Sequence, residues 1–232
     1  MTSSERLGES EKMEIKRTSA IAMQSVSLLS YGHSGAGKTS LIKTLPRPIT
    51  LSAEGGLLSL ADADLPYIEI SKLEDVKEVF HWLEDSDEAK DFDSVALDSI
   101  SEISEVVLTE EKGKTKDGRQ AYGQTNEIMS VIIRSFRDLN KHVYFTAKCE
   151  KMQDDAGRIF YGPSMTGNKL GQSLPYYFDE VLALRVEKDD EGKNQRALLC
   201  DNDGMWSAKD RSGKLDLWEL PDLGEIIKKI QG

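Results

Sequence analysis

The pattern of hydrophobic and polar positions predicts that strands and helices alternate over most of the chain. Short apolar runs bounded by glycine, proline or polar residues are typical of buried strands. Such runs occupy residues 26–32, 49–53, 67–70, 92–99 and 142–147. Alternation of these strands with helices favours a parallel sheet that is flanked by helices.

Helices are expected between these strands. A short helix over residues 40–45 ends before Pro46, because proline cannot continue a helix. Ser71 and Glu74 have the spacing of a capping box for a helix that runs to about residue 85. The segment ISEISEVVL begins another helix. A later helix is indicated by apolar residues at helical spacing, namely Ile128, Val131, Ile132, Phe136 and Leu139.

The last third of the chain changes character. Residues 180–188 and 195–201 are apolar runs separated by a turn, which predicts antiparallel strands, and a short helix over residues 223–230 closes the chain. The expected fold is therefore α/β, with a mostly parallel sheet flanked by helices and antiparallel strands at its C-terminal edge. The polar, charged residues 1–14 predict a disordered tail, and residues 15–232 a single domain.

Composition narrows the class of protein. The chain has 232 residues, 38% of them hydrophobic and 31% charged, and a formal net charge of −11. This charge disfavours a protein that coats itself in nucleic acid over its whole surface, but it permits a local basic loop. No apolar run reaches the roughly 20 residues that a membrane span needs. The only cysteines, Cys149 and Cys200, have no paired spacing, so a reducing cytoplasm is expected.

The segment GHSGAGKT, residues 32–39, matches the phosphate-binding pattern GxxxxGK[ST] and lies between a predicted strand and a predicted helix. Glycines let backbone N–H groups surround phosphate oxygens, and the following helix adds positive potential. Lys38 can reach the β- and γ-phosphates, and the Thr39 hydroxyl can bind Mg²⁺. The expected ligands are ATP and Mg²⁺. The expected nucleotide contacts are Gly32, His33, Ser34, Gly35, Ala36, Gly37, Lys38, Thr39 and Ser40.

Asp98 ends the apolar strand over residues 92–99. A carboxylate at the carboxyl end of a parallel strand can hold the Mg²⁺ shell, so Asp98 is a second candidate metal ligand beside Thr39. The alternative role for Asp98 is to cap the next helix, and Ser99 can fill that role instead.

These motifs resemble those of the RecA-like core ATPases, and in particular the phage-encoded Sak-four group of single-strand annealing proteins. The resemblance runs from about residue 24 to 226 and includes LDSIS at residues 97–101. It implies that Glu54, in LSAEGG, is the carboxylate that activates the attacking water. It also implies a polar γ-phosphate sensor at the end of the segment HVYFTAK, for which Thr146 and Lys148 are the candidates.

The resemblance implies two DNA-binding loops, over residues 111–124 and 149–167. The first is rich in cations and contains Tyr122, whose ring could stack on a base. The second is not basic and offers Arg158. The DNA-binding candidates are Lys112, Lys114, Lys116, Arg119 and Arg158.

The segment SAKDRSG, residues 207–213, is similar to the lysine-x-arginine finger of hexameric helicases. By that resemblance, Lys209 and Arg211 would act catalytically on the ATP of a neighbouring subunit. A finger of this kind has no target in a monomer, so the chain is expected to form a homo-oligomer, either a ring or a filament.

The leading hypothesis is an ATP-dependent, single-stranded-DNA-binding ATPase of phage recombination or annealing, active in the host cytoplasm and independent of membranes. A single-strand-binding protein is a further expected partner. One alternative is a nucleotide-gated assembly scaffold with slow hydrolysis and no direct DNA role. Another is a small-molecule kinase, since kinases share the phosphate-binding pattern.

Overall fold

The computed structural model describes residues 25–232 except positions 155 and 190, so the expected tail over residues 1–14 lies outside the described residues. Ten strands of the described part form one sheet in the order β10-β8-β7-β1-β5-β4-β2-β3, with β6 paired to β5 and β9 paired to β7. The strands are β1 (Ser27–Gly32), β2 (Pro48–Ser52), β3 (Tyr67–Glu69), β4 (Ser94–Asp98), β5 (His142–Gln153), β6 (Ile159–Ser164), β7 (Glu180–Lys188), β8 (Asn194–Leu199), β9 (Lys209–Asp210) and β10 (Trp218–Glu219).

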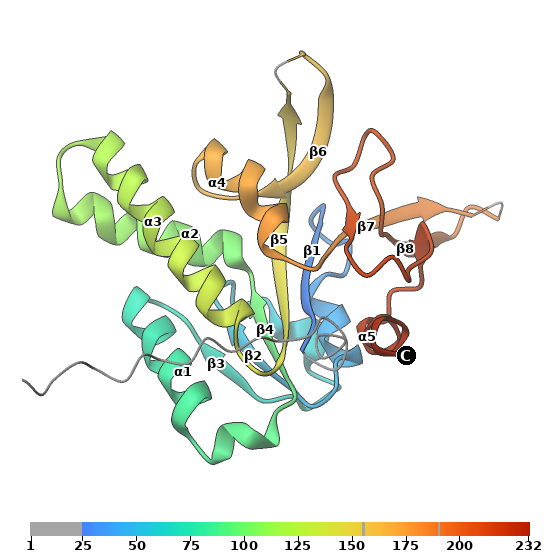
Figure 1. Ribbon diagram of the computed structural model, residues 1–232, viewed down its shortest axis with the longest axis horizontal. Helices are drawn as coiled ribbons and strands as arrows, with labels where there is room; N and C mark the ends of the chain where they lie inside the picture. Colours follow the sequence, from blue (N-terminus) through green and yellow to red (C-terminus); the bar gives the residue numbers. More distant parts are fainter. Residues whose placement is uncertain (1–24, 155, 190) are drawn as a thin grey trace, which may run out of the picture.

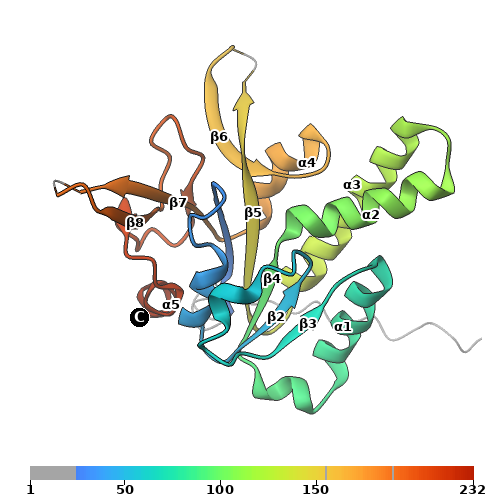
Figure 2. The same ribbon diagram turned by 180° about the vertical axis from the view of Figure 1, so that it is seen from behind.

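Helices cover both faces of the central strands (Figures 1 and 2). The α-helices are α1 (Leu73–Asp85), α2 (Ile100–Lys114), α3 (Gly118–Arg137), α4 (Asn168–Ser173) and α5 (Leu223–Gln231). Short 3₁₀ helices are η2 (Thr39–Thr44), η3 (Leu57–Leu60), η4 (Glu88–Asp91) and η5 (Leu174–Tyr177). In the described residues, none of these helices combines the length and the hydrophobicity that a membrane span requires.

The sheet separates two apolar clusters, and β1 contributes to both because successive side chains of a strand point to opposite faces. Leu29 and Tyr31 belong to the larger cluster, which also contains apolar residues of α1, α2 and α3. Leu28 belongs to the smaller cluster, with residues of η2 and α5. This burial on both sides fixes β1 at the centre of the sheet, so the loop that follows it emerges at the middle of the sheet edge.

The predicted α/β fold, a mostly parallel sheet flanked by helices with antiparallel strands at its C-terminal edge, is confirmed. Strands β7, β1, β5, β4, β2 and β3 run parallel, and β8, β9 and β10 add antiparallel pairs on the side of the last third of the chain. The helix predicted over residues 40–45 is present as the 3₁₀ helix η2. Val131 was expected on the apolar face of α3 but is 62% exposed, because the buried positions of that helix include Met129, Ile132, Ile133 and Phe136.

The predicted loop over residues 111–124 is wrong. Helix α2 continues to Lys114, and α3 begins at Gly118, which leaves a turn of three residues. Asp117 caps α3 by accepting a 2.9 Å hydrogen bond from the Arg119 amide. The glycines of this segment cost the helices some stability, and the packing of α2 against α3 offsets that cost.

The predicted loop over residues 149–167 is also wrong over most of its length. Strand β5 runs on to Gln153 and pairs with antiparallel β6, so that a β-hairpin extends beyond the sheet edge (Figure 1). Asp154 closes the turn because its carboxylate accepts a 2.8 Å hydrogen bond from the Arg158 amide. Strand pairing and this turn replace the flexible loop that the charged sequence suggested.

Candidate active site

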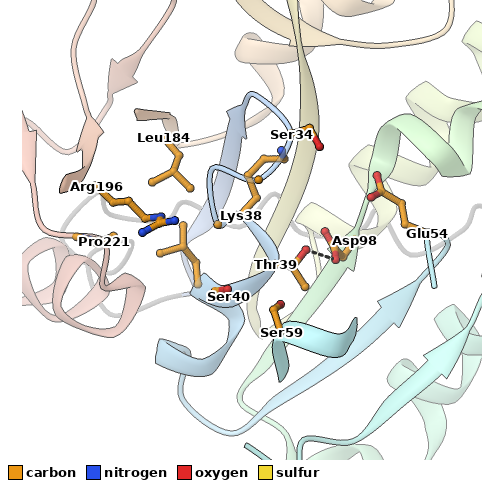
Figure 3. Close-up of a pocket in the computed structure, with 13 residues that line it drawn as sticks. Ser34, Lys38, Thr39, Ser40, Glu54, Ser59, Asp98, Leu184, Arg196 and Pro221 are labelled. Atoms are coloured by element: carbon orange, nitrogen blue, oxygen red, sulfur yellow. Dashed lines mark hydrogen bonds between the residues drawn. The ribbon is translucent and has the colours of Figure 1, made fainter. Parts of the chain in front are cut away.

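A cavity of about 550 Å³ lies at the carboxyl ends of β1, β2 and β4. Lys38 and Thr39 reach it from the loop after β1, Glu54 from the segment after β2, and Asp98 from the end of β4 (Figure 3). The carboxyl ends of parallel strands are where α/β folds place their ligand sites. Residues from three segments that lie apart in the sequence therefore meet in one cavity.

The glycine loop has the backbone that its sequence predicts. Gly35 and Gly37 have φ angles of +76° and +109°, which L side chains rarely adopt. A Cβ atom on Gly35 would meet nothing within 4 Å, so the space in front of this turn is open. The Lys38 ammonium donates to the carbonyl oxygens of Gly32 at 2.9 Å and His33 at 3.2 Å. The lysine thus spans the loop, and its charge lies over the space that the loop surrounds.

Thr39 and Asp98 form the oxygen pair that a Mg²⁺ site needs. The Thr39 hydroxyl donates a 2.8 Å hydrogen bond to Asp98 Oδ2, and the Thr146 hydroxyl donates to Asp98 Oδ1. Asp98 is 2% exposed. A hydroxyl and a buried carboxylate fit Mg²⁺, which takes few protein oxygens and keeps several waters or phosphate oxygens in its shell. Ser99, not Asp98, caps α2 by accepting a hydrogen bond from the Glu102 amide.

Glu54 lies on the same side of the loop as Asp98 (Figure 3). Its carboxylate accepts a hydrogen bond from the Ser99 hydroxyl, and its side chain remains exposed to the cavity. This contact fixes one carboxylate oxygen and leaves the other accessible to solvent. A carboxylate held in this way beside a phosphate-binding loop can orient and deprotonate a water molecule.

Burial acts on the two charged groups in opposite senses. It raises the pKa of Asp98 above its ordinary value, although hydrogen bonds from Thr146 and Thr39 oppose that shift. It lowers the pKa of Lys38, and the carboxylates of Glu54 and Asp98 oppose that shift. Both charges are thus partly desolvated, which strengthens their interaction with a charged ligand.

The family follows from comparison with known proteins. A profile described as "AAA domain", AAA_24, matches residues 24–212, which is most of the chain. The chain belongs to the AAA_24 family. Membership places it among the P-loop ATPases. No curated protein matches the sequence. Among solved structures, a KaiC-like protein from Pyrococcus horikoshii is similar at a TM-score of 0.41 and 11% identity, over 76% of this chain and 78% of that one.

In this AAA_24 chain, six of the nine predicted nucleotide contacts line the cavity, namely Ser34, Gly35, Gly37, Lys38, Thr39 and Ser40. Gly32 does not line this cavity. A Cβ atom on Gly32 would lie 2.6 Å from the Leu184 carbonyl oxygen. His33 and Ala36 instead line a neighbouring cavity of about 410 Å³. Gly32 is therefore required by the close approach of β1 to β7 rather than by contact with a ligand.

His33 connects the glycine loop to the β5–β6 hairpin. Its ring makes edge contacts with Tyr161 on β6 and with Trp206, at centroid distances of 5.8 and 5.6 Å. Tyr161 and Trp206 stack on each other at 4.6 Å. The Tyr31 hydroxyl, from β1, donates to the Tyr161 carbonyl at 3.0 Å. These contacts form a continuous packed path from the loop to the base of the hairpin.

The two sensor candidates have other partners in this structure. Thr146 is fully buried, and its hydroxyl donates to the carboxylate of Asp98, the candidate metal ligand. Lys148 forms an ion pair with Glu102 of α2. Lys148 is exposed, and its strand position is opposite Gly32.

The DNA-binding candidates lie on two projecting elements. Four of them gather at the exposed tip of the α2–α3 hairpin, namely Lys112, Lys114, Lys116 and Arg119. Lys112 lies over the Tyr122 ring at 5.4 Å from its centroid. Arg158 lies in the turn of the β5–β6 hairpin and pairs with Asp154 at 3.2 Å. Both elements extend beyond the sheet edge that carries the glycine loop (Figures 1 and 2).

Lys209 and Arg211 do not line the cavity of their own chain. They lie beside the start of β7, because Lys209 pairs with Val181 on that strand. On its other side, Val181 pairs with Leu29 of β1. The Lys209 ammonium donates to two carbonyl oxygens, of Pro175 and Phe178. Arg211 forms a 2.8 Å ion pair with Asp179.

Five cavity residues were missed by sequence reasoning, namely Leu41, Ser59, Leu184, Arg196 and Pro221. Ser59 lies in the short 3₁₀ helix η3 and Pro221 in the irregular segment before α5, and no motif marks either residue. The sequence pattern could have marked Arg196, because strand alternation places it on the same face as Leu198 and Cys200, both of which are buried. A charged side chain on the buried face of a strand needs a specific partner, because burying an unpaired charge is costly.

Proposed function

We propose that this AAA_24 protein hydrolyses ATP with Mg²⁺ in the cavity beside residues 32–39, and that it acts on single-stranded DNA in phage recombination or annealing. One observation carries the first part. A phosphate-type loop, the Thr39–Asp98 pair and the carboxylate of Glu54 converge on a single cavity. ATP hydrolysis needs these three elements together, because one holds phosphates, one holds the metal and one activates water.

Each residue then has a defined role. Lys38 and the loop amides hold the β- and γ-phosphates, and Thr39 and Asp98 hold Mg²⁺, which would neutralise charge on the phosphates. Thr146 keeps the Asp98 carboxylate turned toward Thr39. Glu54 accepts the proton of the attacking water, and Ser99 keeps its carboxylate beside the cavity.

The DNA role is supported by the placement of the basic tip. Although the chain has a net charge of −11, four cations and Tyr122 are grouped at the end of the α2–α3 hairpin. A group of cations with an aromatic ring is typical of sequence-tolerant contact with single strands. Because the tip is formed by helices rather than by a mobile loop, we propose that it is a preformed contact surface.

The β5–β6 hairpin supports a link between ATP and DNA. His33, within the glycine loop, packs against Tyr161 at the base of that hairpin. A change in the loop on γ-phosphate binding or release would therefore be transmitted to the hairpin through packed rings. We propose that Arg158 at the hairpin turn contacts DNA in the ATP-bound state.

The proposed assembly is a homo-oligomer in which Lys209 and Arg211 reach the ATP of a neighbouring copy. Within one chain, Arg211 is paired with Asp179 and lies away from the cavity. The trans role therefore requires Arg211 to exchange this exposed pair for phosphate, a small cost since exposed ion pairs contribute about 0–1 kcal/mol.

ATP turnover with and without single-stranded DNA, measured together with particle size, tests this proposal. We expect turnover to rise clearly with DNA and the particle to grow with ATP analogue present. A protein that hydrolyses ATP slowly and ignores DNA would instead be a nucleotide-gated scaffold. Addition of a single-strand-binding protein in the same assay tests for a partner of that class.

A further inference from the structure

Arg196 links β8 to the glycine loop. On β8 it is opposite Val186, and its side chain reaches across to the loop. Its Nε donates a 2.8 Å hydrogen bond to the carbonyl oxygen of Ala36. It also packs against Gly37, where a Cβ would lie 3.3 Å from the same Nε. A side chain larger than hydrogen at position 37 would therefore press on this contact.

The rest of the guanidinium is available for a ligand. Among the described residues, no carboxylate lies within ion-pair distance of Arg196, whereas Arg185 on the neighbouring strand pairs with both Glu187 and Asp203. Arg196 remains exposed and lines the cavity of the candidate active site. An arginine with one nitrogen on a carbonyl and no acid partner keeps donors and a full positive charge for an anionic or polar ligand.

The position of Arg196 indicates which end of a nucleotide it would meet. Glu54 and Asp98 lie on one side of Lys38 and Thr39, and Arg196 lies with Pro221 and Leu184 on the other side (Figure 3). The side of Glu54 and Asp98 is the γ-phosphate side, because metal and water activation belong there. The opposite side therefore receives the α-phosphate and the nucleoside. Leu184 and Pro221 give this side an apolar surface.

We propose that Arg196 is a positioning residue for the α-phosphate and nucleoside half of the bound nucleotide, and that its Nε holds the Ala36 carbonyl out of the phosphate space. The inference rests on the proposed function and adds to it a residue on a strand outside the phosphate-binding motif. Because the contact does not involve the γ-phosphate, it serves ADP and ATP equally.

The test compares nucleotide affinity and turnover in the wild-type chain, Arg196→Met and Arg196→Lys. Methionine keeps an unbranched apolar side chain, and lysine keeps the charge without the planar donors. Titration calorimetry would use ADP and a non-hydrolysable ATP analogue. Arg137→Ala is the control for loss of an arginine, because Arg137 lies at the end of α3 and pairs with its neighbour Asp138. Thermal melting checks that each variant folds.

For Arg196→Met, we expect the affinities for ADP and for the ATP analogue to fall by the same factor, roughly ten- to a hundredfold, as for a charged hydrogen bond. Arg196→Lys should be intermediate, and turnover at saturating ATP should change less than the Michaelis constant. Unchanged affinity in a folded Arg196→Met would overturn the inference. A decrease confined to the ATP analogue would also overturn it, because it would place Arg196 at the γ-phosphate. Failure of the wild-type chain to bind either nucleotide would instead refute the proposed function.

Discussion

The hydroxyl of Thr39, in the glycine loop, donates a 2.8 Å hydrogen bond to the carboxylate of Asp98, at the end of β4. These residues are 59 positions apart and come from different segments of the sheet edge. The contact joins the two halves of the proposed Mg²⁺ site. The Thr146 hydroxyl donates to the other oxygen of Asp98, so we predict that Thr146 supports the proposed metal site.

Replacing Thr146 by valine should weaken Mg²⁺ binding without removing it. Valine has nearly the same shape but leaves one Asp98 oxygen without its donor. Removal of a partner of this kind typically costs 10–100-fold in metal affinity, so the Mg²⁺ concentration for half-maximal ATP turnover should rise by about tenfold. Thr125→Val is the matched control, because Thr125 is also buried and its hydroxyl donates to the Ala121 carbonyl within α3. An unchanged Mg²⁺ dependence in Thr146→Val would refute this role.

Neutralising the basic tip should weaken single-stranded-DNA binding and reduce its salt dependence. For every DNA phosphate that the variant no longer neutralises, the slope of log affinity against log salt should fall by roughly 0.7. The variant changes four cations to glutamine, at Lys112, Lys114, Lys116 and Arg119. A control with the same change in charge uses exposed lysines elsewhere, at Lys72, Lys77, Lys90 and Lys193. An equal decrease of DNA affinity in both variants would mean that only net charge matters.

Mixing two inactive variants tests the shared site. Arg211→Ala chains keep Glu54, and Glu54→Gln chains keep Arg211, so a mixed interface regains one complete site. We expect a mixture to turn over ATP faster than either variant alone. If no mixing ratio restores activity although the chains associate, Arg211 acts only within its own chain through its ion pair with Asp179.

Glu180 predicts a pH dependence of stability. It is 0% exposed, and burial together with the nearby carboxylate of Asp210 raises its pKa to about 8. Between pH 4.5 and about pH 8 the folded state therefore holds a proton on Glu180 that the unfolded chain has released. The stability that comes from the protonated carboxyl is complete below about pH 4.5 and is lost as pH rises through about 8. We therefore compare the unfolding free energy of Glu180→Gln with that of wild type at two pH values. The difference in favour of the variant should be larger at pH 9 than at pH 4, by on the order of 2–4 kcal/mol. Urea unfolding at both pH values would measure it, and an equal difference at the two pH values would contradict it.

The strands and the phosphate-binding loop could be predicted from sequence because local signals determine them. Apolar runs of strand length gave the positions of the parallel strands, and the glycine pattern after β1 gave the loop. The segment over residues 111–124 was misjudged because its glycines and charges are typical of a loop, whereas in the structure Ala121 is buried and tertiary packing stabilises the two helices. That burial depends on the packing of α2 against α3, which no local window contains.

Arg196 and Thr146 illustrate the limit for the site. Arg196 comes within reach of Ala36 only because β7 pairs with both β1 and β8, which is a property of sheet order. Thr146 could be placed at the correct sheet edge from sequence, but its partner, Asp98, depends on the rotation of two buried side chains. The type of chemistry could therefore be inferred, and the supporting contacts could not.

Glu54→Gln tests the central claim most directly, by ATP binding and ATP hydrolysis measured on the same preparation with Mg²⁺. Lys38→Ala, which should abolish ATP binding, and Glu69→Gln, at an exposed position on β3, are the controls. We predict that Glu54→Gln binds ATP nearly as wild type does, but turns it over at least about a hundredfold more slowly, the usual contribution of a general base. Normal turnover by Glu54→Gln, with ATP bound, would contradict the account.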